Sequence, residues 1–537
     1  MKWSAWRLVP FLAVLAIPET LLSQPAFLVE DLRTDPDNLV FLLPSQEFTA
    51  LGTTVFFLRD DRLHGIEIWK SDGTQAGTGL LIDLCPGACS STPRSLTVSN
   101  GALFFIADDG ARGLELWKSD GTAAGTVLVK DVFPGSGNPF TQGTPGGLLD
   151  VNGVVYFAAN DGVHGQELWK SDGTTAGTLL VKDVNPGPES SHPRPWAANG
   201  DTLLFSANDG THGREPWVSD GTDAGTLLLE DVHPGTADSS GSGSPETDGR
   251  DALAAPGGGF LFRAEDDTHG YELWITDGTP AGTALLKDIH PAGGSNPTNL
   301  SALGPAVYFA ASDGANGTEL WKTDGTEAGT VLLKDSPPGG TGSGPREIVA
   351  SGSRIFFRAV DETHGAELWL SDGTAAGTVL VKDIAPGIND GLILGFGDHL
   401  HGVTPFGGGI LFFAGLQLWS SDGTEAGTVQ VSTLNGLNQP ALLLNVRESW
   451  AAAGSLFFFS TSGGVDAEPT LWKSDGTTAG TSSLLFPQPL ASSITPNFNF
   501  LLGEHSFAEH EGRLVFVMDR SVTDQEVWTS DATPAGT

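Results

Sequence analysis

A single motif, Glu-Leu-Trp-x-Ser-Asp-Gly-Thr-x-Ala-Gly-Thr in its commonest form, recurs ten times along this chain of 537 residues. Successive motif tryptophans are 47 to 57 residues apart, and 48 is the commonest spacing. Self-similarity at about 40–50 residues is typical of propellers and solenoids, in which each unit packs only against its neighbours. The motif tryptophans are Trp69, Trp117, Trp169, Trp217, Trp274, Trp321, Trp369, Trp419, Trp472 and Trp528.

Each repeat has the pattern of four short strands. In the copy around Trp117, the expected strands are Ser95–Ser99, Ala102–Ala107, Leu114–Lys118 and Val127–Val132. Asn100-Gly101 joins the first two and predicts a type I′ turn, which needs positive φ at both residues. The second strand is apolar on both faces, as in a sheet sandwiched between two others. We therefore expect an all-β fold in which one repeat is one propeller blade.

The two ends of the chain are in phase with each other. Phe27–Leu32 matches Val127–Val132, the strand that follows the Ala-Gly-Thr turn, and the sequence stops at Gly536-Thr537, where that strand is due. We therefore expect one closed ring of ten four-stranded repeats, in which the N-terminal strand completes the last blade. Ten blades exceed the usual 4–8, so two five-bladed rings or a truncated array are the alternatives.

The first residues have the layout of a secretory signal peptide. Lys2 and Arg7 precede the apolar run Leu8–Ile17, and that run is too short to span a bilayer. We expect residues 1–23 to be cleaved and residues 24–537 to form the propeller; an uncleaved interfacial anchor is the alternative. This layout predicts a secreted or cell-surface protein.

The charge of the chain restricts its partners. The formal net charge is -38, from 65 acidic and 27 basic residues. Such a surface repels nucleic acid and anionic membranes and keeps an exported protein soluble. We expect no nucleic-acid partner, no membrane insertion after signal cleavage and a monomeric state. A glycan or an extracellular protein remains as a candidate partner.

The chain has two cysteines, Cys85 and Cys89, in the loop Cys-Pro-Gly-Ala-Cys. In an exported protein this pair predicts a local disulfide. The pair lacks the further ligands of a zinc site, and its spacing differs from that of redox motifs.

The block Glu115-Leu116-Trp117-Lys118-Ser119-Asp120-Gly121-Thr122 resembles the ELWxxDGT repeat family of exported bacterial proteins. The resemblance extends through all ten copies and so covers essentially the whole mature chain. It implies a secreted or surface-attached bacterial propeller, in a family whose members mostly lack an assigned activity.

An aspartate recurs in the hairpin before the motif and is often followed by His-Gly. A calcium ion bound in each blade is one interpretation, and calcium is the one candidate cofactor. However, calcium needs six to eight oxygen ligands, whereas turn chemistry alone accounts for Asp and Gly at a hairpin. The candidate ligands are Asp109, Asp161, Asp209, Asp267, Asp313 and Asp361.

Charged residues also recur on the strands that flank the motif turn. If Lys118 faces Val127, then Glu115 faces Lys130, and the same offset recurs in most repeats. We therefore predict cross-strand Glu–Lys pairs that fix the strand register.

For function, the sequence favours a non-enzymatic interaction protein that binds glycan or protein through its inter-blade loops. Trp196, Phe140 and Phe396, in or near the least repetitive loops, could stack on sugar rings. Packing of these aromatic side chains against the rim of the blades is the alternative.

The competing hypothesis is a secreted carbohydrate-active enzyme, a glycoside hydrolase or a lyase, on the propeller scaffold. Paired carboxylates could do such work, but among 65 acidic residues they do not discriminate. A catalytic centre should appear as repeats that depart from the others by gaining His, Arg, Tyr or Glu. The eighth to tenth repeats depart, at Gln417, Thr470 and Ala532, but they lose polar features. No catalytic residue is therefore assigned from the sequence.

Overall fold

The computed structural model confirms an all-β, propeller-like chain. It describes residues 28–30, 49–60, 63–72, 77–135, 137–140, 147–239, 252–335, 342–384, 401–414, 417–431, 450–453, 456–461, 470–483, 507–510, 513–521 and 524–530. The one helical element among these residues is the 3-10 turn η1, Pro280–Gly282. None of the described helical segments is long and apolar enough to cross a membrane.

The strands form four-stranded antiparallel sheets, each built from consecutive strands except the sheet in which β1 joins β38, β39 and β40. We call each sheet a blade and number the blades from β2 onwards. Blade 1 contains β2 Thr49–Leu51, β3 Thr54–Asp60, β4 Ile66–Ser71 and β5 Gly79–Leu80. Blade 2 contains β6 Arg94–Ser99, β7 Ala102–Asp108, β8 Leu114–Ser119 and β9 Val127–Lys130. Blade 3 contains β10 Leu149–Val151, β11 Val154–Asn160, β12 Gln166–Ser171 and β13 Leu179–Lys182. Blade 4 contains β14 Arg194–Asn199, β15 Thr202–Asn208, β16 Arg214–Ser219 and β17 Leu227–Leu228.

The second half continues in the same order. Blade 5 contains β18 Ala252–Ala254, β19 Phe260–Asp266, β20 Gly270–Thr276 and β21 Ala284–Lys287. Blade 6 contains β22 Thr298–Leu303, β23 Ala306–Ser312, β24 Thr318–Thr323 and β25 Val331–Lys334. Blade 7 contains β26 Arg346–Ser351, β27 Arg354–Asp361, β28 Gly365–Ser371 and β29 Val379–Lys382. Blade 8 contains β30 His401–Phe406, β31 Gly409–Ala414, β32 Gln417–Ser421 and β33 Val429–Gln430.

Two further sheets are described mainly through their backbone pairing. One contains β34 Trp450–Ala453, β35 Leu456–Thr461, β36 Thr470–Ser474 and β37 Ser482–Ser483. The other contains β38 Phe507–His510, β39 Arg513–Ser521 and β40 Asp524–Ser530. The short strand β1, Leu28–Glu30, pairs antiparallel with β40.

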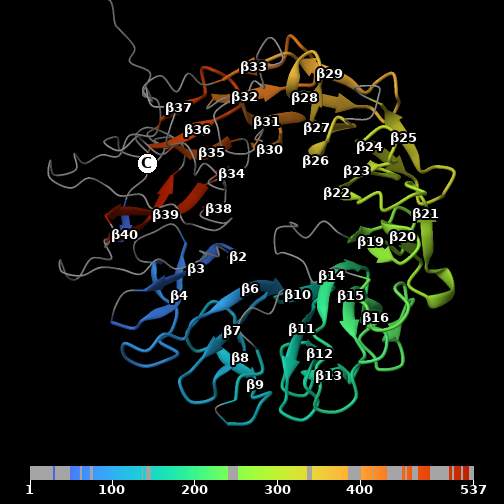
Figure 1. Cartoon of the computed structure of the whole chain (residues 1–537). Coiled ribbons are helices and arrows are strands. Elements are labelled where there is room, and N and C mark those ends of the chain that lie inside the picture. The colour runs from blue at the N-terminus through green and yellow to red at the C-terminus, as the bar shows by residue number, and fades with distance from the viewer. Residues whose placement is uncertain are drawn as a thin grey trace, which may run out of the picture.

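The blades follow one another around a wide arc (Figure 1). The first strand of each blade lies on the inner side of the arc, and the last strand lies on the outer side. Each blade has two ends. At one end the chain enters from the previous blade, and a hairpin joins the second strand to the third. The turns of the repeated motif lie at the opposite end.

The turns in blade 2 match the sequence prediction. Asn100 and Gly101 have φ values of 47° and 75°, as a type I′ turn requires. In the motif turn, Asp120 Oδ1 accepts hydrogen bonds from Thr122 N (2.9 Å) and Thr122 Oγ1 (2.7 Å). A Cβ atom on Gly125 would lie 2.0 Å from Asp120 Oδ1, so this position requires glycine. The recurrent Asp and Gly residues are therefore the internal bonding of a turn.

The hydrophobic core lies between neighbouring blades. Phe104, Ile106 and Leu116 of blade 2 pack against Phe157 and Trp169 of blade 3. The same kind of cluster recurs between the following blades. Blades 2 to 8 are covered on both faces, and their central strands are accordingly apolar on both faces.

The predicted Glu–Lys cross-strand pairs are wrong. Lys118 does face Val127, but a β-bulge shifts the register, and Lys130 lies opposite Leu116 instead of Glu115. Lys130 Nζ instead donates a hydrogen bond to the carbonyl oxygen of Thr178 in blade 3 (2.7 Å). Equivalent bonds link each of these lysines to the next blade: Lys287 to Thr330, Lys334 to Thr378 and Lys382 to Thr428.

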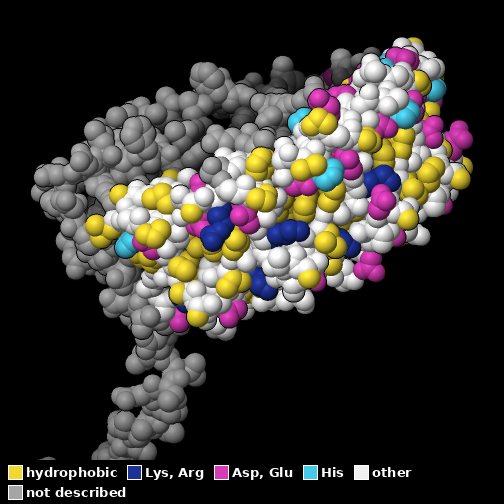
Figure 2. Space-filling model, turned by 90° about the horizontal axis from the view of Figure 1, so that it is seen from below, with side chains coloured by type: hydrophobic (Ala, Val, Ile, Leu, Met, Phe, Trp, Pro, Cys, Tyr) yellow, Lys and Arg dark blue, Asp and Glu magenta, His cyan; other side chains and the backbone are white. Residues whose placement is uncertain are grey.

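Figure 2 shows one side of the molecule, on which Lys and Arg side chains lie apart from one another among polar and apolar groups. The first residue of the fourth strand is apolar and exposed in several blades. These residues are Val127, Leu179, Leu227, Val331, Val379 and Val429. The side in view shows no continuous run of Lys and Arg side chains.

Candidate functional site

In blades 1 to 7 a buried motif glutamate lies at the start of the third strand, and in blade 3 it fastens the blade to the loop that leaves it. Glu167 is fully buried and accepts hydrogen bonds from Val184 N (3.0 Å), Ser191 N (2.9 Å) and Ser191 Oγ (2.6 Å). Burial raises the pKa of Glu167 to about 7 and that of Glu115 to about 8. The same buried position is occupied by Glu67, Glu115, Glu215, Glu272, Glu319 and Glu367. Because these carboxyl groups are sealed inside the blades, we treat them as part of the scaffold.

The hairpin aspartates are bonded within their own turns. Asp161 Oδ1 accepts hydrogen bonds from Val163 N and His164 N (both 2.9 Å), and its Oδ2 lies 2.7 Å from His164 Nδ1. Asp109, Asp209, Asp313 and Asp361 bond in the same way within their hairpins. Within the described part of the chain, no three His, Cys, Asp or Glu side chains form a group that could hold a metal ion.

The fifth of these hairpins differs from the sequence prediction. There Asp266 bonds to Thr268 N and His269, as its counterparts do, whereas Asp267 Oδ1 lies 2.7 Å from His233 Nε2. Asp267 is therefore not the equivalent of the other candidate ligands.

The predicted sugar-stacking residues do not form a common surface. Phe140 is buried, with its ring centre 5.7 Å from that of Phe157, so it belongs to the core. Trp196 is half-buried and packs against Phe262 of blade 5 at 6.2 Å. Phe396 lies outside the described residues. Elsewhere, Cys85 and Cys89 form a disulfide bond.

The repeats provide an internal comparison that reveals a different group of residues. The position before the motif glutamate is apolar in blades 1, 2 and 7, where it is Ile66, Leu114 and Ala366. In blades 3 to 6 it is Gln166, Arg214, Tyr271 and Thr318. Larger polar side chains thus occupy this position in three consecutive blades, at the end where the chain enters from the previous blade.

His192 lies between blades 3 and 4 and contacts one of these residues. Its Nδ1 atom is 2.9 Å from Gln166 Oε1, which leaves Nε2 without a hydrogen-bond partner among the described residues. The backbone of His192 has a φ of 49°, in the left-handed region, and its side chain reaches solvent. Partial burial lowers the pKa of His192, and the charges of Arg214 and Arg194 lower it further. This is the arrangement of a neutral imidazole that can accept a proton at Nε2.

Two arginines accompany His192. Arg214 Nη1 donates to the carbonyl oxygen of His192 (2.6 Å), and burial lowers the pKa of Arg214. Arg194 begins β14, and its guanidinium has no hydrogen bond or ion pair with another residue that the structure describes. Opposite Arg194 lies Ser206, which is fully buried and whose Oγ atom has no partner among the same residues. A fully buried hydroxyl group without a hydrogen bond is unusual in a folded protein.

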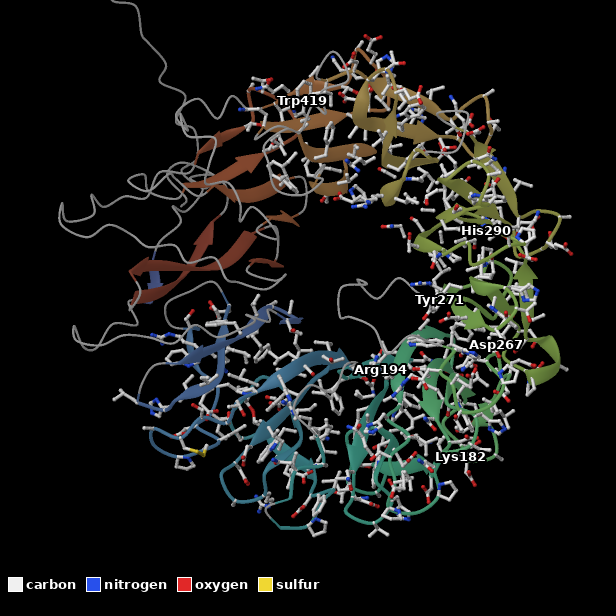
Figure 3. All side chains as sticks on the ribbon, in the orientation of Figure 1. Lys182, Arg194, Asp267, Tyr271, His290 and Trp419 are labelled. Atoms are coloured by element: carbon white, nitrogen blue, oxygen red, sulfur yellow. A yellow bond between two sulfur atoms is a disulfide. The ribbon has the colours of Figure 1, made fainter. Side chains whose placement is uncertain are left out.

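Blade 5 also has polar side chains near this end. The guanidinium carbon of Arg263 lies 4.1 Å from the ring centre of Tyr271, and Arg263 Nη2 donates to Asn296 Oδ1 (3.5 Å). Figure 3 shows Arg194 and Tyr271 on the inner side of the arc, while Lys182 and Asp267 lie further out. We refer to Gln166, His192, Arg194 and Arg214 as the blade 4 cluster.

The blade 4 cluster was not predicted from the sequence. The departures from the repeat noted there lie in blades 8 to 10, whereas the gain of His and Arg lies in blades 3 to 5. A recurring Ser-x-Pro-Arg pattern could have revealed the site, because it ends in Arg94, Arg194 and Arg346. Within this pattern, Ser191-His192-Pro193-Arg194 alone has a histidine at the second position.

Comparison with known proteins gives limited information. No family model matches the chain, and no curated protein matches it either. Solved structures do match. A puromycin hydrolase has 15% sequence identity and a TM-score of 0.29, and the match covers 70% of this chain and 58% of that chain. A prolyl endopeptidase has 11% identity and a TM-score of 0.33, with coverage of 74% and 50%. TolB from Acinetobacter baumannii has 13% identity and a TM-score of 0.25, with coverage of 61% and 76%.

The non-enzymatic interaction protein predicted from the sequence is not retained: the matching structures include a puromycin hydrolase and a prolyl endopeptidase. The chain spans between 50% and 58% of the length of those enzymes. At these identities and TM-scores the similarity assigns neither substrate nor catalytic residue. Both must be argued from the residues of this chain.

Proposed function

We propose that this chain is an extracellular enzyme that acts on a carbohydrate polymer, with its active site at the blade 4 cluster. The observation that carries the proposal is His192, whose Nδ1 is bonded to Gln166 Oε1 (2.9 Å) and whose Nε2 has no partner among the described residues. A histidine oriented by a second residue is a recurrent form of general base. Partial burial and then the charges of the neighbouring arginines lower the pKa of His192, which favours the neutral imidazole.

The scaffold supports this role. Gln166 is buried at the start of β12, and its backbone N donates to Ser190 Oγ (2.9 Å). The loop that carries His192 is fastened by the bonds of Ser191 to Glu167. Rigid support on both sides fixes the position of the imidazole, as catalysis requires.

The test uses purified residues 24–537 and a panel of neutral and acidic polysaccharides. We expect the wild-type chain to release new reducing ends from at least one polymer. The variant His192→Asn should lose about 10²- to 10⁴-fold in rate, the usual contribution of a general base.

The matched control is His364→Asn, which changes a turn histidine bonded to Asp361 in blade 7 and should retain wild-type activity. Equal activity of His192→Asn and wild type, with both folded, would remove His192 from the site. Failure of the wild-type chain to cleave any polymer on the panel would contradict the enzymatic proposal.

We also propose that the blades close into one ring of ten, with β1 completing the sheet of β38, β39 and β40. The pairing of Leu28 with Trp528 supports this arrangement. A closed ring leaves no exposed sheet edge at its junction. Electron microscopy of the purified chain should show single rings of one size, and pairs of smaller rings would contradict the proposal.

The remaining expectations concern the location of the chain. We propose export with removal of residues 1–23, followed by existence as a monomer outside the cell. N-terminal sequencing of the mature protein and its mass in solution test both points.

A further inference from the structure

We infer that the substrate is a polysaccharide of uronic acids, and that the enzyme cleaves it by β-elimination at the blade 4 cluster. This inference rests on the proposed function, because it names the substrate and reaction of the same site. The charges around His192, a buried hydroxyl group and the bonding of the nearby carboxyl groups support it.

Among the described residues, the positive charges of Arg194 and Arg214 are not balanced by a carboxylate bonded to either guanidinium. Arg194 and Arg214 lie close enough for each to affect the protonation of His192, and Arg194 also lowers the pKa of Arg214. The nearest carboxylate among the described contacts, Asp238, accepts a hydrogen bond from the backbone N of Arg214 (2.8 Å) rather than from its guanidinium. In a chain of net charge -38, two adjacent arginines without a carboxylate bonded to either guanidinium favour an anionic ligand.

The buried hydroxyl group of Ser206 is a second feature of this site, and it is independent of charge. This residue is the cross-strand partner of Arg194, and both side chains lie on the same face of blade 4. Its hydroxyl group is fully buried without a described partner, at a position where blade 2 has Ile106 and blade 6 has Ala310. A polar group at this buried position needs a partner that the described residues do not supply, and a water molecule held on the face that carries Arg194 meets that need.

The bonding of the carboxyl groups near the cluster favours β-elimination over hydrolysis. Glycoside hydrolysis ordinarily requires two carboxyl groups, one on each side of the scissile bond. The acidic groups beside the cluster are already engaged: Glu167 with Ser191, and Glu215 with Val232 N (3.0 Å) and Ser239 N (3.1 Å). A free imidazole nitrogen, with two guanidinium groups that bond no described carboxylate, suits the removal of a proton adjacent to a carboxylate.

The reaction balances without water or a cofactor. The arginines bind the uronate carboxylate and stabilise the negative charge that develops when the C5–H bond breaks. His192 Nε2 takes that proton, and the electron pair forms the C4–C5 double bond. The C4–O bond breaks, and its oxygen leaves with the bonding electrons and takes up a proton from the imidazolium or from solvent. The products are one unsaturated uronate end and one new reducing end.

The experiment compares polygalacturonate, alginate and chondroitin with neutral glucans and with methyl-esterified polygalacturonate, in which the carboxylates are masked. Two signals are recorded from each reaction: reducing ends, and the ultraviolet absorbance of the conjugated double bond. We expect both signals in equal amounts from at least one acidic polymer, and neither from the esterified or neutral polymers. This result would support the inference together with the proposed function.

Other outcomes separate the two proposals. Reducing ends without the double bond would show a hydrolase, which overturns β-elimination and leaves the enzymatic proposal intact. Cleavage of neutral or esterified polymers as fast as acidic ones would overturn the uronate substrate. No cleavage of any polymer would overturn both proposals.

Two arginine variants test the role of the charge. Arg194→Gln should reduce kcat/KM on the acidic polymer at least about tenfold, chiefly through KM, and should weaken the dependence of KM on salt. Arg194→Lys should recover part of that loss. The matched control is Arg94→Gln, which changes the equivalent arginine of blade 2, whose Nη2 donates to the carbonyl oxygen of Phe140 (3.2 Å). Equal losses in both variants, or salt dependence unchanged in Arg194→Gln, would contradict substrate binding by Arg194.

Discussion

Blades 2 and 4 share one architecture and differ at the end where the chain enters each blade. Blade 2 has Leu114 and Ile106 there, packed into the core against blade 3. Blade 4 has Arg214 and Ser206 at the same register positions. The motif glutamate, the motif turn and the paired Phe–Trp strands are the same in both blades. In a repeat protein, positions that never change hold the scaffold, and a polar departure in one place indicates a site.

The largest expected effect comes from making blade 4 resemble blade 2. The double variant His192→Thr and Arg214→Leu gives blade 4 the amino acids that blade 2 has at the equivalent positions, Thr92 and Leu114. We expect activity to fall by at least about 10²-fold, because the general base is lost. The melting temperature should stay the same or rise, because a buried charge is replaced by an apolar side chain.

Activity assays and calorimetry on the same preparation test this comparison. An active double variant would show that neither His192 nor Arg214 is needed for catalysis. A large drop in melting temperature would instead show that Arg214 stabilises the fold.

The second prediction concerns what the blades share. Glu115→Ala removes the acceptor for Val132 N (2.9 Å) and Phe133 N (3.3 Å), which leaves two buried donors unpaired. We expect a loss of about 2–3 kcal/mol in the free energy of unfolding. Glu115→Gln keeps an acceptor and should lose less. Urea denaturation measures both variants, and equal losses would show that the packing of residue 115 matters more than its hydrogen bonds.

A third prediction concerns pH. Burial raises the pKa of Glu67, Glu167 and Glu215 to about 7, above the value of 4.5 expected for an unfolded chain. A raised pKa means that the folded state holds the proton more tightly. The stabilisation by these groups is therefore complete below pH 4.5 and is lost as the pH rises through about 7. His164 contributes with the same sign, because its bond to Asp161 raises the pKa of the imidazole.

The hairpin and motif-turn aspartates act in the opposite direction. Hydrogen bonds lower the pKa of Asp120 and Asp172, so their contribution is present above the ordinary value and is lost at more acidic pH. We expect the melting temperature to be highest on the acidic side of neutrality and to fall steadily toward pH 8. A melting temperature that increases between pH 5 and pH 8 would contradict protonation of the buried glutamates.

The smallest expected effect is that of calcium. The hairpin carboxylates already accept hydrogen bonds from their own turns, as Asp361 does from Thr363 N (2.8 Å), so a metal would have to displace those bonds. We expect the melting temperature in EDTA and in millimolar calcium to agree. A rise in calcium would indicate ligands that these hairpins alone do not supply.

Much of the fold could be predicted from the sequence, because its signals are local. The strands of the repeat around Trp117 agree with the predicted ranges to within two residues at either end, and Asn100-Gly101 forms the expected turn. The resemblance to the ELWxxDGT repeat family remains a prediction, since no family model matches. Turn chemistry and strand pattern act over a few residues, which is why a single repeat is sufficient to define them.

The sequence therefore determined the repeating unit, its strands and turns, and the sandwiching of each blade between two others. Only the tertiary structure showed that Glu115 bonds to a loop instead of Lys130, because a β-bulge is invisible in the spacing. Only the tertiary structure brought Gln166 into contact with His192 and placed Ser206 opposite Arg194. Those contacts join neighbouring blades and neighbouring strands, and their geometry depends on how the sheets pack against one another rather than on any local run of residues.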